Sequence, residues 1–166
     1  MFAGLFDEFF GVPTHPFAVH APIVLLPIAA VVAVVFALRS DWRERASWGM
    51  TAGVFALAAM LFVAKESGEA AQNAQNVFGN VDRHSELGEQ TFVITLVWLV
   101  VTAGLFVRDR QIRSAPATSL SAGAVTPSKD PVALGLSILA AVIAIAATIW
   151  LIRTGHAGAE SRWKLG

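Results

Sequence analysis

The sequence predicts an all-α fold, an integral membrane four-helix bundle. Of its 166 residues, 55% are hydrophobic and only 14% are charged, whereas about 25% of residues are charged in an average soluble domain. The apolar residues gather in four long runs, each long enough to cross ~30 Å of hydrocarbon as a helix. A soluble domain of this size cannot bury so much apolar surface, so the excess is expected to face lipid.

We expect one membrane domain over residues 1–166, with short connections between antiparallel spans. Small residues at Gly49 and Gly53 favour close helix packing in the second span. The polar stretch Arg39–Arg45 is expected to be a turn, and residues 114–130, rich in Ser, Ala, Thr and Pro, a flexible inner loop. The predicted spans cover residues 16–38, 48–70, 87–107 and 132–153.

The segment Met1–Gly11 carries phenylalanine and leucine at helical spacing, with Asp7 and Glu8 toward the other side. This pattern predicts a short N-terminal interfacial helix lying on the membrane. The segment has no basic residue, so a signal peptide is not expected.

Charge and composition exclude several functions. The twelve basic and twelve acidic residues cancel, so nothing favours nucleic acid as a partner. The absence of cysteine excludes disulfides, thiolate metal sites, iron–sulfur clusters and covalent haem attachment through CxxCH. We find no nucleophile or general-base constellation, so no catalytic residue is assigned, and an accessory or electron-transfer protein is favoured over an enzyme.

Basic residues near the span ends indicate the orientation. Seven lie in the first and third connections: Arg39, Arg43, Arg45, Arg108, Arg110, Arg113 and Lys129. Five lie on the other side: Lys65, Arg83, Arg153, Arg162 and Lys164. Because the excess marks the cytoplasmic side, both termini are expected outside.

The four histidines are the main functional signal. His15, His20, His84 and His156 all fall at span ends on the same side of the membrane. Neighbouring helices of a bundle lie ~10 Å apart, so imidazoles from different helices can meet. His20 lies about one turn inside the first span, where burying an imidazole without a partner is costly.

Three interpretations of this histidine cluster stay open. It is a metal or haem site, because imidazole is a common ligand of Zn, Cu and Fe and of haem iron. Or it is a proton relay that also uses carboxylates on the same side, such as Glu66 and Glu69. Or the histidines only cap helices and bind loop backbone.

Three motifs resemble the DUF2231 family of small bacterial four-helix membrane proteins of unknown function. They are His15-Pro16 followed by Val19-His20-Ala21-Pro22-Ile23, the histidine that opens the third helix, His84, and the element Thr154-Gly155-His156-Ala157-Gly158-Ala159, which Trp163 follows. The resemblance implies a multi-pass protein of a bacterial inner (plasma) membrane and supplies no activity. It selects His20, His84 and His156 and leaves His15 as a secondary candidate.

Haem b fits a cysteine-free apolar bundle because it needs only one or two histidines. We expect His20 as one axial ligand and His84 or His156 as the other. A propionate would pair with Arg153 or Lys65. The aromatic residues that would pack on the porphyrin are Phe17, Trp98 and Trp150.

The rival ligand is a single Zn, Cu or Fe ion. Its site would combine three histidines with a glutamate, as four-coordinate metals require. The candidate metal ligands are His20, His84, His156, Glu66 and Glu69.

The function that follows is haem b binding for electron transfer beside a redox partner, where the cofactor performs the chemistry. The alternative is a non-catalytic membrane subunit or anchor of a larger complex, whose histidines only tie helix ends together. In both cases the lipid bilayer surrounds the chain.

Overall fold

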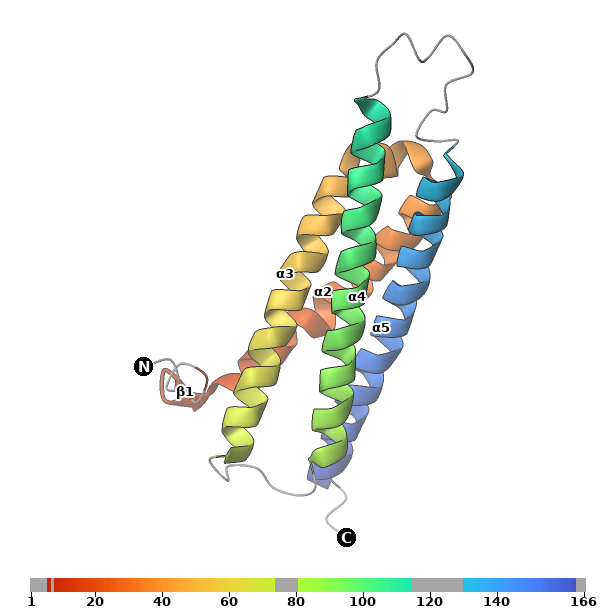
Figure 1. Cartoon of the computed structure of the whole chain (residues 1–166). Coiled ribbons are helices and arrows are strands. Elements are labelled where there is room, and N and C mark those ends of the chain that lie inside the picture. The colour runs from red at the N-terminus through yellow and green to blue at the C-terminus, as the bar shows by residue number, and fades with distance from the viewer. Residues whose placement is uncertain (1–5, 7, 74–80, 115–129, 164–166) are drawn as a thin grey trace, which may run out of the picture.

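A computed structural model of the chain describes residues 6, 8–73, 81–114 and 130–163. Within them, four helices are long and apolar enough to cross a membrane, which confirms the predicted four-helix fold. They run antiparallel (Figure 1). The elements are β1 (Glu8–Phe9), β2 (Val12–Pro13), α2 (Thr14–Leu38), α3 (Ser40–Asn73), α4 (Asp82–Arg113) and α5 (Pro131–Trp163).

The helices extend beyond the predicted apolar spans. Only Arg39 separates α2 from α3, so the prediction of a polar turn over Arg39–Arg45 is wrong. These polar residues form the first turns of α3, where Asp41 suits the positive end of the helix dipole. Helix α4 likewise begins with an acidic residue, Asp82. Of the predicted loop 114–130, residues 115–129 lie outside the described residues.

A hairpin precedes the first helix. Glu8 pairs with Pro13 and Phe9 with Val12. The two residues between the strands, Phe10 and Gly11, have φ angles of 53° and 76°, as a type I′ turn requires. The interfacial helix predicted over Met1–Gly11 therefore does not extend through Glu8–Gly11; residues 1–5 and 7 lie outside the described residues.

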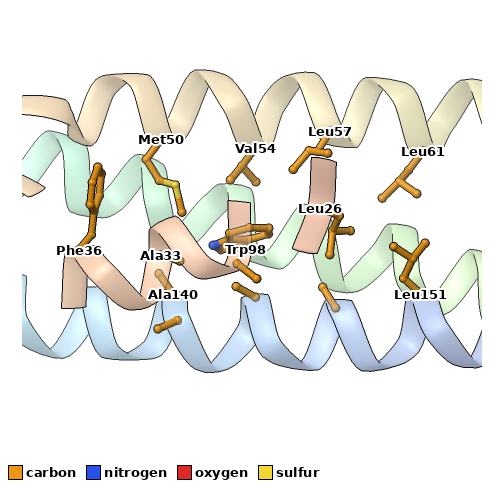
Figure 2. Close-up of a cluster of buried hydrophobic side chains, with 14 residues drawn as sticks. Leu26, Ala33, Phe36, Met50, Val54, Leu57, Leu61, Trp98, Ala140 and Leu151 are labelled. Atoms are coloured by element: carbon orange, nitrogen blue, oxygen red, sulfur yellow. The ribbon is translucent and has the colours of Figure 1, made fainter. Parts of the chain in front are cut away.

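The four helices form a ring in which α2 packs on α3 and α5, and α4 on the same two helices. Trp98 of α4 is fully buried at the centre, and Figure 2 shows it between side chains of the surrounding helices. Helix α5 contributes mainly alanines, which let neighbouring backbones approach closely. The buried ones include Ala133, Ala140, Ala141, Ala144 and Ala147.

The hairpins α2–α3 and α4–α5 bury equivalent positions. Along α3 the buried residues Ser47, Met50, Val54, Leu57 and Leu61 match, at one constant sequence offset, positions that are also buried on α5: Ser137, Ala140, Ala144, Ala147 and Leu151. The buried positions of α2 and α4 also correspond, at a second constant sequence offset. Pro22, Leu26, Ala33 and Phe36 of α2 match Thr91, Thr95, Thr102 and Leu105 of α4. The bundle is therefore a pseudo-twofold arrangement of two helical hairpins.

The end of the bundle where α2 and α4 finish, the arginine end, holds buried charges. Arg43 Nε lies 3.5 Å from Asp109 Oδ1, and both side chains are almost fully buried. Arg108 donates from Nη2 to Asp130 Oδ2 at 2.8 Å. Asp130 also caps α5, because its Oδ1 accepts the backbone N–H of Ala133 at 2.7 Å.

Candidate functional site

A cavity of about 470 Å³ opens at the opposite end of the bundle, which we call the histidine end. It lies where α2 and α4 begin and α3 and α5 finish, and all four helices line it. His15 and His84 both line this cavity, and we call them the histidine pair. The fold thus brings imidazoles from its first and third long helices together, as the topology predicted.

His15 crosses from α2 to α3. Its Nδ1–H donates to the carbonyl oxygen of Ala64 at 2.9 Å, with Ser67 Oγ 3.3 Å from the same nitrogen. Gly68, one turn further along α3, gives the ring room. A Cβ at this position would lie 3.1 Å from His15 Cε1.

His84 repeats this arrangement from α4 to α5. Its Nδ1–H donates to the carbonyl oxygen of Thr154 at 2.8 Å. Gly158, one turn further along α5, lies against the ring, and a Cβ there would come within 2.9 Å of His84 Nδ1. Each half of the cavity therefore uses a histidine, a backbone carbonyl on the next helix and a glycine four residues later.

The symmetry extends to the rest of the cavity lining. Leu61, Ala64, Gly68 and Ala71 of α3 correspond to Leu151, Thr154, Gly158 and Ser161 of α5. Pro16, Val19 and Pro22 of α2 correspond to Ser85, Gly88 and Thr91 of α4. The histidine pair therefore lies across the pseudo-twofold axis, with two similar half-sites facing each other.

The hydrogen bonds fix which nitrogen each histidine offers to the cavity. A carbonyl oxygen only accepts, so Nδ1 carries the proton in both rings and the neutral ring has its lone pair on Nε2. Among the described residues, neither Nε2 atom has a hydrogen-bond partner. The ring centroids are 6.0 Å apart and the ring planes are nearly perpendicular, at 84°.

This separation suits a shared metal. With metal–nitrogen bonds of about 2.0–2.1 Å and a ring radius of about 1.1–1.2 Å, two imidazoles on opposite sides of one metal have centroids about 6.4 Å apart. A backbone carbonyl on Nδ1 is the usual partner of a ligating histidine, because it fixes the ring and raises the basicity of the other nitrogen.

The structure places His15 beside His84 in the cavity, whereas His20 was predicted as one axial ligand and His84 or His156 as the other. His20 is exposed and does not line the cavity; its Nδ1–H donates to the carbonyl oxygen of Pro16 in its own helix. The reason is helical periodicity, because five residues place His20 about 140° around the helix from His15. The side chain of His156 is 73% exposed, with Nε2 3.5 Å from Glu160.

The predicted acidic ligands serve another role. Lys65 Nζ lies 3.4 Å from Glu66 and 2.5 Å from Glu69, so both carboxylates neutralise the same ammonium group. Lys65 and Glu69 line the cavity, whereas Glu66 does not. Among the described residues, no three His, Asp or Glu side chains form a group able to hold a metal ion. The five predicted ligands of a single ion are therefore not assembled.

The predicted porphyrin contacts also lie elsewhere. Phe17 is exposed, Trp98 is in the hydrophobic core, and Trp150 donates from Nε1 to Gln90 Oε1. The guanidinium of Arg153 lies 4.8 Å from the centre of the Trp150 ring, in a different hollow from the histidine pair. Lys65 is the predicted propionate partner that does line the cavity.

Sequence reasoning missed Gly68 and the two backbone carbonyls. The periodicity of α2 contained a signal for His15, since it lies two turns before Pro22 and so continues the buried face of Pro22, Leu26, Ala30 and Ala33. The carbonyls of Ala64 and Thr154 carry no sequence signal, because every residue has one.

The comparisons with known proteins identify one match. No curated protein and no solved structure is significantly similar to this chain. The family model described as "Predicted membrane protein (DUF2231)" matches residues 11–166, which include β2, all four helices and both members of the histidine pair. The chain therefore belongs to the DUF2231 family of predicted membrane proteins.

Proposed function

We propose that this protein binds haem b between His15 and His84 and transfers single electrons at the membrane. The observation that carries the proposal is the histidine pair itself, in which both Nδ1–H groups are held by backbone carbonyls while both Nε2 atoms remain for a ligand. The ring separation of 6.0 Å supports two imidazoles on one metal.

The number of protein ligands favours haem over a bare ion. Haem supplies four nitrogens to its iron and requires only one or two axial side chains from the protein. A zinc ion in a structural site requires about four protein ligands, and one in a catalytic site about three. The described part of the chain offers the histidine pair and no group of three metal-binding side chains.

The cavity lining also suits a large planar ligand. Its volume of about 470 Å³ falls in the usual range of ~300–1,000 Å³ for ligand pockets. Glycines occupy several lining positions, including Gly68, Gly88 and Gly158, and those at 68 and 158 leave room for the imidazole rings at the cavity wall. Lys65 would pair with a propionate by exchanging one of its two carboxylate partners.

When bound, haem b supplies one-electron exchange at its iron, with a potential tuned by its axial ligands and their hydrogen bonds. The residues of this chain bind it, orient its plane and exclude water. The Ala64 and Thr154 carbonyls hold the rings and strengthen Nε2 as a donor.

The test is an absorption spectrum of the full chain, purified in detergent from membranes of cells supplied with a haem precursor. We expect one haem per chain, with a Soret band that shifts on reduction by dithionite. His15→Ala and His84→Ala should each abolish this low-spin spectrum. His20→Ala and His156→Ala are matched controls and should leave it unchanged.

Electron paramagnetic resonance sharpens the test. Because the rings are nearly perpendicular, the oxidised protein should give the strongly anisotropic low-spin signal of crossed imidazole ligands. A protein that contains no haem and does not bind added haemin would overturn the proposal. Each histidine would then only tie together the two helices of its own hairpin, as in a non-catalytic membrane subunit.

A further inference from the structure

A second hollow lies on the outer surface of α4 and α5 at the histidine end. Its volume is about 740 Å³, and we call it the Arg153 groove. His15 and His84 do not line it, so it is separate from the haem proposal. Its lining contains two cations and three anions: Arg83, Arg153, Asp82, Glu86 and Glu160.

A chain of hydrogen bonds builds the floor of the groove. Trp150 Nε1–H donates to Gln90 Oε1 at 2.7 Å, and Gln90 Nε2 donates to Glu86 Oε1 at 3.1 Å. An indole N–H only donates, so it fixes the Gln90 amide with its NH₂ group toward Glu86. The Glu86 carboxylate is thereby held in place and keeps acceptor capacity for a further cationic donor.

Arg153 is held at the same floor. Its guanidinium lies 4.8 Å from the centre of the Trp150 ring, a cation–π contact that leaves the N–H donors at the edge of the guanidinium plane available. Among the described residues, neither Arg153 nor Arg83 forms an ion pair. The groove therefore combines a fixed carboxylate with guanidinium donors that the protein leaves unsatisfied.

The residues around the groove are of the types found where a helix end meets phospholipid headgroups. Tryptophan is typical of the membrane–water interface, and the helical face of Glu86 and Gln90 continues toward the membrane centre with two exposed apolar residues, Val93 and Val97. From Gln90 to Asp82 the groove rises about 12 Å along α4, at 1.5 Å per residue. This height exceeds the ~5–8 Å of one interfacial layer, so a groove whose lower edge lies at the acyl boundary extends into water.

We propose that the Arg153 groove binds phosphatidylethanolamine, a zwitterionic phospholipid with a primary ammonium group. The phosphate binds Arg153 and Arg83, the ammonium donates to Glu86, and the acyl chains lie along Val93 and Val97. A choline headgroup cannot donate a hydrogen bond to Glu86. An anionic glycerol headgroup supplies no ammonium group to the Glu86 carboxylate.

The test measures lipid retention by native mass spectrometry of the full chain in detergent, titrated with dioleoyl lipids carrying ethanolamine, choline or glycerol headgroups. The ethanolamine lipid should be retained about tenfold better than either competitor, the factor that one charge-assisted hydrogen bond supplies. Glu86→Gln should remove most of the preference over choline. Arg153→Gln should weaken retention of ethanolamine and choline lipids about equally, because both contain the phosphate.

Matched controls remove the same charges elsewhere. Glu89→Gln changes a neighbouring exposed carboxylate that does not line the groove, and Arg39→Gln changes an exposed arginine at the other end. Both should retain the ethanolamine lipid like the natural chain, and thermal unfolding should confirm that every variant folds. Equal retention of the three lipids by the natural chain, or unchanged retention in Glu86→Gln and Arg153→Gln, overturns the proposal.

Discussion

The two ends of the bundle treat their polar side chains in opposite ways. At the arginine end the chain neutralises its own charges, pairing Arg43 with Asp109 and Arg108 with Asp130. At the histidine end, His15 and His84 line a cavity, and each uses one ring nitrogen for the fold and leaves the other without a hydrogen-bond partner among the described residues. The comparison indicates that the arginine end compensates its buried charges within the fold, whereas the histidine end leaves two ring nitrogens that the proposed function assigns to a ligand.

The largest expected effect is at the arginine end. Asp109→Ala should lower the free energy of unfolding by about 3–5 kcal/mol, because it removes the carboxylate that pairs with the buried guanidinium of Arg43. Reversible unfolding in detergent measures the loss. The double replacement Arg43→Met with Asp109→Leu should restore much of the stability, since it removes both charges.

Asp41→Ala, which removes an exposed carboxylate at the same end of the bundle, is the matched control and should cost less than about 1 kcal/mol, the contribution of a charge at a helix terminus. If Asp109→Ala unfolded like the natural chain, the arginine end would not be a stabilising element, and the contrast between the two ends would fail.

The next effect concerns the histidine end. Gly158→Ala places a methyl group 2.9 Å from His84 Nδ1, and overpacking of this kind costs about 1–3 kcal/mol. We expect haemin affinity to fall about tenfold or more, as measured by absorption titration. Gly155→Ala is the control, because its Cβ would meet no atom within 4 Å; equal losses in both variants would refute the role of Gly158.

The α5 cap should make the arginine end sensitive to acid. The hydrogen bond from Arg108 lowers the pKa of Asp130, and the backbone N–H of Ala133 lowers it further. A lowered folded-state pKa means that this stabilisation is present above the unfolded-state pKa of about 3.9. It is lost as the pH falls through the folded-state value.

Asp130→Ala should therefore cost about 1 kcal/mol at neutral pH, as loss of a helix cap does, and progressively less in acid. The measurement is the unfolding midpoint between about pH 7 and about pH 3, where the curves of the two proteins should converge as Asp130 is protonated. A difference that stays constant with pH would contradict this account.

The smallest expected effect is at Lys65, where replacement should change haemin affinity more than the stability of the fold. Lys65→Gln removes an ion pair that is partly exposed, so the free energy of unfolding should fall by less than about 1 kcal/mol. Haemin affinity should fall a few-fold, because the variant loses the cavity cation for a propionate. A large loss of stability with unchanged haemin affinity would instead assign Lys65 to the fold.

The fold was predictable because four apolar runs admit few arrangements in a membrane. The same topology correctly predicted that histidines lie at one end of the bundle, because His15 and His84 are near the start of the first and third long helices. The choice among the histidines failed for a physical reason. The apolar neighbours of His20 suggested that its side chain is buried in the bundle. In a membrane helix, however, apolar residues also face lipid, and His20 is exposed.

The buried charge of Arg43 was similarly hidden. Arg43 lies in a run of charged residues that is typical of a solvated turn, and only its helical spacing with Ser47, Met50 and Val54 indicated a buried face. Its partner Asp109 comes from another helix, so the pair depends on a contact that sequence spacing alone does not reveal.

The pseudo-twofold arrangement also bears on how the protein matures. His15 is made with the first helix and its carbonyl partner Ala64 with the second, so one half-site can assemble as soon as that hairpin enters the membrane. The other half-site requires Thr154, near the end of the last helix. On the proposed function, haem loading between the two histidines would therefore follow insertion of the whole chain, and bound haem would mark completed biogenesis.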